Sequence, residues 1–152
     1  MLDRRRLATL PRADLGWLKA RHHFPVDGRP DPDQIWIEPR RAGGRPEYAT
    51  RRFPSRERNA FSVLSTGLEE DAGTDALPLR ADARLVAGVL EAGRSLSWKL
   101  ATGRSAYLVP ASGKVLVNGV EVEEGDGVAV TDEARIELIA LRDAEVVAVE
   151  LA

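Results

Sequence analysis

The pattern of hydrophobic and polar positions in this chain changes at about residue 61. From there on, short apolar or alternating runs are separated by turn residues, which is typical of β-sandwiches and β-barrels. Residues 95–100 alternate strictly, so Trp98 and its apolar neighbours fall on one face of a strand. Asn118-Gly119 lies between two further runs and indicates a tight hairpin, because a type I′ turn needs positive φ at both central positions. The pattern predicts an all-β fold.

The runs predict strands over residues 34–38, 61–65, 84–90, 95–100, 105–109, 114–117, 120–123, 128–130, 135–141 and 145–151. We expect the last two strands to form a hairpin that turns at Arg142-Asp143. The acidic run 69–75 is typical of a solvated loop, and no helical periodicity follows residue 75.

Residues 1–60 have a different character, because prolines interrupt them throughout. Each proline fixes φ and removes a backbone donor, so long regular elements are not expected there. We therefore expect an irregular N-terminal segment over residues 1–33 that lies across a single barrel formed by residues 34–152.

Composition limits the class of protein further. A length of 152 residues suits one domain. The absence of cysteine excludes disulfides and thiolate ligands. No apolar run approaches the roughly 18 residues of a membrane span, and the N-terminus lacks the apolar stretch of a signal peptide. These features predict a cytoplasmic protein that does not enter the membrane.

Charge is divided unevenly along the chain. Residues 1–58 hold 14 Lys and Arg against 8 Asp and Glu, whereas the remainder holds 8 against 16. Such asymmetry can indicate nucleic-acid binding, but the basic residues are scattered and no aromatic stacking platform accompanies them. We favour a basic segment that lies across an acidic barrel, either its own or that of a neighbouring subunit.

Several motifs resemble the pirin family. Residues 106–109 (AYLV), 112–119 (SGKVLVNG) and 124–127 (EGDG) resemble a cupin, and more narrowly the C-terminal half of a pirin. Residues 14–24 are similar to the family's opening segment, and residues 34–39 to the link into its second barrel. The family includes quercetin 2,3-dioxygenase-like proteins, and its members carry two cupin barrels. The resemblance implies a cupin-type double-stranded β-helix, or jelly-roll barrel, and only residues 25–33 stand where the family has its metal-binding first barrel.

The resemblance also implies where metal ligands would stand. Cupin enzymes hold iron, manganese or nickel with histidines and a carboxylate, ligands that suit such metals. Alignment on the glycines of the two cupin motifs puts these positions near Ala101, Gly103, Ala106 and Ala134. None of the four can ligate a metal, so we expect neither a metal centre nor a cofactor, and we assign no catalytic residue.

Other candidate ligands have simpler interpretations. His22 and His23 are adjacent, and neighbours in an extended segment point to opposite faces. We interpret His22 as a structural histidine. An all-carboxylate magnesium or calcium site at Asp31 and Asp33, or along residues 121–124, stays open in principle, although the spacing of a known loop is missing.

These observations favour a non-catalytic pirin-like cupin module that acts in oligomerisation, as a homodimer, or in small-molecule binding. Trp98 and Tyr107 are the candidate lining of a pocket inside the barrel, and the simpler interpretation is that both fill the core. Two alternatives come from the family resemblance: a quercetin 2,3-dioxygenase-like oxygenase, and a ligand-binding regulatory protein.

Overall fold

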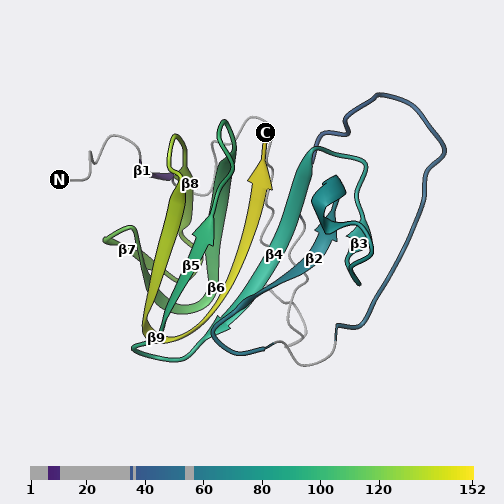
Figure 1. Ribbon diagram of the computed structural model, residues 1–152. Coiled ribbons are helices and arrows are strands. Elements are labelled where there is room, and N and C mark those ends of the chain that lie inside the picture. Colours follow the sequence, from purple (N-terminus) through teal and green to yellow (C-terminus); the bar gives the residue numbers. More distant parts are fainter. Residues whose placement is uncertain (1–6, 11–34, 36, 54–56) are drawn as a thin grey trace, which may run out of the picture.

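The computed structural model describes residues 7–10, 35, 37–53 and 57–152, and this part of the chain is built from β-strands without an α-helix (Figure 1). The strands are β1 (Leu7–Leu10), β2 (Phe61–Thr66), β3 (Leu77–Pro78), β4 (Ala83–Leu90), β5 (Ser95–Lys99), β6 (Ser105–Val117), β7 (Val120–Glu123), β8 (Gly127–Val130) and β9 (Arg135–Leu151), and a 3₁₀ turn, η2, covers Glu69–Asp71. The all-β prediction is confirmed. No helix among the described residues is long and apolar enough to cross a bilayer.

Two long strands, β6 and β9, connect the two layers of the fold. They pair with each other along nearly their whole length. All nine strands form one continuous sheet. Its main path, β1-β8-β6-β9-β4-β2-β3, is called the large sheet here, and the part in which β7 pairs with β6 and β5 with β9 is called the smaller sheet. The two layers enclose one core, as expected for a jelly roll.

The predicted hairpin at Arg142-Asp143 is wrong, because β9 continues through these residues as a single strand. The pairing of β6 with β9 shifts register at Ser112 and again at Lys114, and the chain bends there from one layer into the other. Such irregularities bend a strand without ending it. Gly113 makes the bend possible: it has φ +80°, and a Cβ at this position would overlap the carbonyl oxygen of Asp143.

The hairpin predicted at Asn118-Gly119 is confirmed. Both residues have positive φ, 46° and 81°, and they join β6 to β7. The side chain of Asn118 also bridges to β9, since its Oδ1 accepts a hydrogen bond from the backbone of Glu137 at 2.7 Å.

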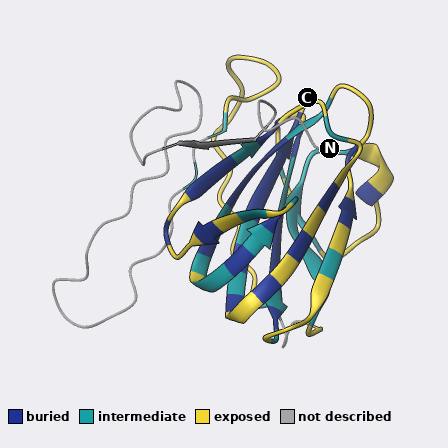
Figure 2. Ribbon diagram, turned by 90° about the vertical axis from the view of Figure 1, so that its left-hand side faces the viewer, coloured by how far each residue is buried: buried dark blue, intermediate teal, exposed yellow. Residues whose placement is uncertain are grey.

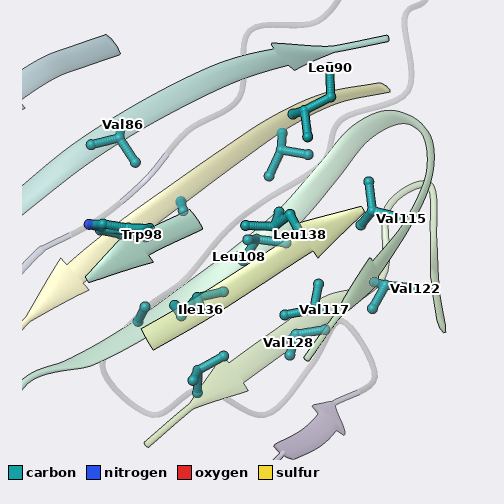
Figure 3. Packing of buried hydrophobic residues seen from close by; sticks show 14 of the residues in the cluster. Val86, Leu90, Trp98, Leu108, Val115, Val117, Val122, Val128, Ile136 and Leu138 are labelled. Carbon is teal, nitrogen blue, oxygen red and sulfur yellow. The ribbon is translucent and has the colours of Figure 1, made fainter. Parts of the chain in front are cut away.

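The main core lies between the two layers. Side chains from both sheets form it, and the labelled members converge in Figure 3. Figure 2 shows the alternation of buried and exposed residues along the strands that makes this possible. Trp98 packs within the core, with its ring 5.3 Å from that of Phe61 at a tilt of 59°. Tilted aromatic pairs at this distance are favourable beyond the area they bury.

A second, smaller cluster covers the outer face of the large sheet. Val149 and Leu151 of β9 lie in it, together with Ile35 and Ile37. The strand expected over residues 34–38 is absent from the described residues of that segment, which packs on the sheet by its apolar side chains without joining it. In contrast, β1 was not predicted and pairs antiparallel with β8.

The acidic run 69–75 is more structured than predicted. Asp71 is buried rather than solvated, with 9% of its surface exposed. Its Oδ2 accepts a hydrogen bond from Thr66 at 2.6 Å, and its Oδ1 lies 3.2 Å from a guanidinium nitrogen of Arg84. The acidic run therefore supplies a carboxylate, that of Asp71, which balances the positive charge of Arg84 on β4.

Candidate functional site

Two loops form one open end of the barrel, which we call the barrel mouth: residues 100–104 between β5 and β6, and residues 131–134 between β8 and β9. A backbone hydrogen bond from Leu100 to Ala134 joins the loops at 3.1 Å. They surround a cavity of about 420 Å³. Its lining consists of Leu100, Ala101, Thr102, Gly103, Arg104, Ser105, Asp132, Glu133 and Ala134.

The structure brings together three of the four positions at which the family resemblance implies metal ligands. Ala101, Gly103 and Ala134 all line the mouth cavity and are exposed. Ala106 lies deeper, in the main core, with 3% of its surface exposed. The four positions are therefore grouped around the mouth, but none of their side chains carries a donor atom.

A buried carboxylate occupies the inner face of the large sheet at this end. Glu150 pairs in register with Ala106 on one side and with Arg84 on the other, so the three share the face that lines the core. Its side chain is 1% exposed. Oε2 accepts hydrogen bonds from Arg84 at 2.7 and 3.2 Å, and Oε1 accepts one from Arg104 at 2.6 Å. Charged groups that are removed from water in this way require partners of opposite charge.

A second tier of acids completes the network. Arg104 also donates to a carboxylate oxygen of Asp82 at 2.9 Å, and Arg84 pairs with Asp71 and, at 3.0 Å, with Glu70. Burial acts to lower the pKa of Arg84, but the hydrogen bond and charge of Glu150, together with the charges of Asp71 and Glu70, outweigh it and raise the pKa above its usual value. Arg84 therefore stays cationic at the mouth.

The residues at the mouth do not fit a metal ion of the cupin type. Among the described residues, no three His, Cys, Asp or Glu lie close enough together to hold one. Both oxygens of the buried Glu150 already accept hydrogen bonds from guanidinium groups, so a cation there would meet two fixed positive charges. His22, His23, Asp31 and Asp33 lie outside the described residues.

The carboxylates of residues 121–124 serve a different purpose. Glu121 and Glu123 both pair with the ammonium group of Lys114 across β6 and β7. The hydrogen bond from Lys114 lowers the pKa of Glu123 below its usual value. These carboxylates hold a lysine on the outer face of the smaller sheet.

The structure separates the two aromatic residues predicted to line a pocket. Trp98 faces the core, but Tyr107 points to the opposite face of β6 from its core neighbours Ala106 and Leu108. Tyr107 is therefore outside the main core cluster. Its ring lies over Gly127, where a Cβ would overlap the phenol oxygen, and burial raises the pKa of the Tyr107 hydroxyl. Neither residue lines the mouth cavity. Whether either contacts a ligand stays a prediction.

The network around Glu150 was missed at the sequence level, although a signal for it exists. In β9 the buried residues Ala144, Val146 and Ala148 alternate along one face of the strand, and Glu150 is the next residue on that face. In β4 the buried residues Leu90 and Val86 share a face with Arg84. A charged residue on the buried register of a strand, matched by an opposite charge on another strand, indicates an internal ion pair.

Comparison with known proteins agrees with this architecture. Residues 68–151 match the model of the quercetinase C-terminal cupin domain. The chain is 47% identical over 120 residues to a pirin-like protein of Caulobacter vibrioides, a match that covers 78% of this chain and 51% of that protein. It is 48% identical, with the same coverage, to a putative quercetin 2,3-dioxygenase of Pseudomonas aeruginosa.

Solved structures give the same result. The crystal structure of YhhW from Escherichia coli superposes with a TM-score of 0.73 at 29% identity, covering 79% of this chain and 49% of that one. YhhW has also been solved as a bacterial pirin in complex with nickel(II), and that structure superposes with a TM-score of 0.71. The chain spans about half the length of the curated relatives it matches. The match over residues 68–151 and the shared barrel show that this chain belongs to the pirin family of cupin proteins, as a quercetinase-type C-terminal cupin domain.

Proposed function

We propose that this chain is a non-catalytic pirin-like cupin module that contains no metal centre and acts by binding a small molecule or by self-association. The observation that carries the proposal is the buried Glu150, whose two carboxylate oxygens are held by Arg84 and Arg104 at the barrel mouth. An oxygenase of the cupin type needs histidines and a carboxylate with open positions for substrate and oxygen. Here both oxygens of Glu150 already accept hydrogen bonds from Arg84 and Arg104.

The mouth cavity supports the small-molecule part of the proposal. Its volume of about 420 Å³ lies within the range of ligand pockets, which runs from about 300 to 1,000 Å³. Small residues and backbone line much of it, and its charged rim includes Arg104 and Glu133. A thermal-shift screen of small molecules against the chain is expected to return one chemical class that raises the melting temperature by several degrees. The reason is that a ligand that binds only the folded state stabilises it by mass action.

The competing function is that of a metal-dependent oxygenase. Two Escherichia coli relatives that are 31% identical carry the name quercetin 2,3-dioxygenase, and YhhW has a nickel(II) complex. These names describe proteins about twice as long as the matched region. For this chain the oxygenase is the alternative against which the proposal is tested.

Elemental analysis decides between the two functions. The purified chain is incubated in turn with nickel(II), iron(II), manganese(II) and copper(II), desalted and measured, with YhhW treated in parallel as the control that takes up nickel. We expect far less than one metal per chain and no oxygen consumption with quercetin. One metal per chain that survives desalting, or turnover of quercetin above the rate of the metal alone, overturns the proposal.

A further inference from the structure

A segment of the chain projects from the barrel and is anchored only at intervals. Residues 38–53, which we call the strap, form the blue loop beyond β2 and β3 in Figure 1. The backbone of Arg40 donates to Arg80 at 2.8 Å, and the side chain of Arg80 in turn donates to the carbonyl of Arg45 at 2.9 Å. Arg51 donates to Asp75 near the far end. The strap is thus held against its own barrel at three places.

The strap exposes positive charge and one aromatic ring. Tyr48 is 91% exposed, the highest value among the large apolar side chains in the described residues. Arg41, Arg45 and Arg52 are also exposed, and among the described residues their guanidinium groups have no ion-pair partner. Tyrosine and arginine in combination are enriched at the centres of protein–protein interfaces.

A groove of complementary character lies elsewhere on the barrel. It has a volume of about 690 Å³ and is lined by Ala92, Gly113, Glu123, Glu124, Leu141, Arg142 and Asp143. Lys114 and Arg142 neutralise Glu123, whereas Glu124 has no ion-pair partner among the described residues. Leu141 is 41% exposed, as is Ile139 two residues before it on the same face of β9. We call this the acidic groove.

The strap and the acidic groove lie apart on the same molecule. The groove includes the end of β7, and Figure 1 places β7 and the strap on opposite sides of the molecule. A contact between them must therefore be made by two molecules. The division of charge along the chain supports a second copy as the partner, since residues 1–58 are net basic and the remainder is net acidic.

We infer that the acidic groove receives the strap of a second copy of this chain, with Tyr48 packed against Leu141 and the arginines of the strap facing Glu124 and Asp143. Because the strap and β7 lie on opposite sides of one molecule, each chain gives its strap to one neighbour and receives the strap of another, so the contact is head-to-tail. The inference rests on the proposed function only in that it names the surface used for self-association.

Charge reversal tests the contact on the full chain by sedimentation velocity over a range of protein concentrations. The strap variant combines Arg41→Glu with Arg45→Glu, and the groove variant is Glu124→Arg. Each is expected to raise the dissociation constant of this contact about tenfold or more, because each places like charges opposite one another. Tyr48→Ser is expected to weaken the contact as well. Lys99→Glu, an exposed change of the same kind on β5, is the control and should leave the dissociation constant unchanged.

Mixing the variants gives the sharper result. The reversed strap of one variant is complementary to the reversed groove of the other, so an equimolar mixture should associate, with the two variants alternating, at concentrations at which each variant alone is monomeric. Circular dichroism of each variant confirms that the barrel is folded. A wild-type chain that is monomeric at all concentrations, or a self-association that neither variant weakens, or a mixture that fails to recover, overturns the inference. The same samples are analysed for metal: a monomer without metal contradicts only this inference, whereas a stoichiometric metal contradicts the proposed function whatever the oligomeric state.

Discussion

At the scale of single residues, the main feature beside the barrel mouth is one buried carboxylate. Glu150 stands on the buried register of β9, where its neighbours two and four residues earlier are Ala148 and Val146. Arg84 and Arg104 are each about 85% buried at the side chain and turn toward it. Removing one member of such a network leaves the others charged, buried and without a partner.

Glu150→Ala is therefore expected to lower the free energy of unfolding by about 3–5 kcal/mol, the usual loss when one partner of a buried ion pair is removed. The measurement is urea denaturation followed by tryptophan fluorescence. Glu137→Ala is the matched control on the same strand, because its side chain is 64% exposed and lies 4.0 Å from Arg135. It should change stability by less than about 1 kcal/mol. Equal losses in the two variants would contradict a structural role for the network.

At the scale of elements, the decisive feature is the bend shared by β6 and β9. The strands do not end at the bend, so the hydrogen-bonded ladder passes from one layer of the barrel to the other. This requires the two backbones to approach closely at Gly113. A Cβ there would lie 2.8 Å from the Cα of Ala144, in a backbone conformation of φ +80° that side chains rarely adopt.

Gly113→Ala is expected to cost about 2–4 kcal/mol, the sum of overpacking and of the left-handed conformation. Gly103→Ala provides the control, because Gly103 has a similar φ of +78° but nothing lies within 4 Å of a Cβ at that position. Its expected cost is only the conformational one, about 1–2 kcal/mol. Thermal and urea denaturation of the two variants separate the cost of the close backbone approach from the cost of the left-handed backbone conformation. A Gly103 variant as unstable as the Gly113 variant would show that the close approach is unimportant.

At the scale of the whole molecule, the outer face of the large sheet must also be covered. Ile35 and Ile37 pack on the cluster formed by Ala81, Ala83, Val149 and Leu151. The sheet thus has apolar side chains on both faces, and Ile35 and Ile37 help to shield the second one from water. The barrel and this segment are stabilised together.

Ile37→Ala is accordingly expected to lower the free energy of unfolding by about 1–2 kcal/mol, less than for a fully buried isoleucine because Ile37 is only partly buried. Hydrogen exchange should rise in β9 near Val149 before it rises in the main core. Thr50→Ala, an exposed change in the strap, should alter stability by less than about 0.5 kcal/mol. If Ile37→Ala is equally neutral, the segment does not stabilise the sheet.

Much of the β-structure could be predicted from local pattern. The alternation around Trp98 and the turn at Asn118-Gly119 depend on neighbours in the sequence, and both predictions are confirmed. The continuity of β9 could not be predicted in this way, because Arg142 and Asp143 resemble turn residues and only pairing with β6 keeps them extended. The same reason explains the orientation of Tyr107: it depends on which face of β6 the opposite layer covers.

The class of fold, the family resemblance and the lack of ligand-bearing side chains at four positions follow from the amino-acid sequence alone; these positions are Ala101, Gly103, Ala106 and Ala134. These depend on residue type and local order, and both are readable along the chain. Folding is needed to bring Glu150, Arg84 and Arg104 together beside the barrel mouth, and to place the strap and β7 on opposite sides of the molecule. The physical reason is that ion pairing and surface complementarity depend on distances between residues far apart in sequence, which are set when the two layers close on their common core.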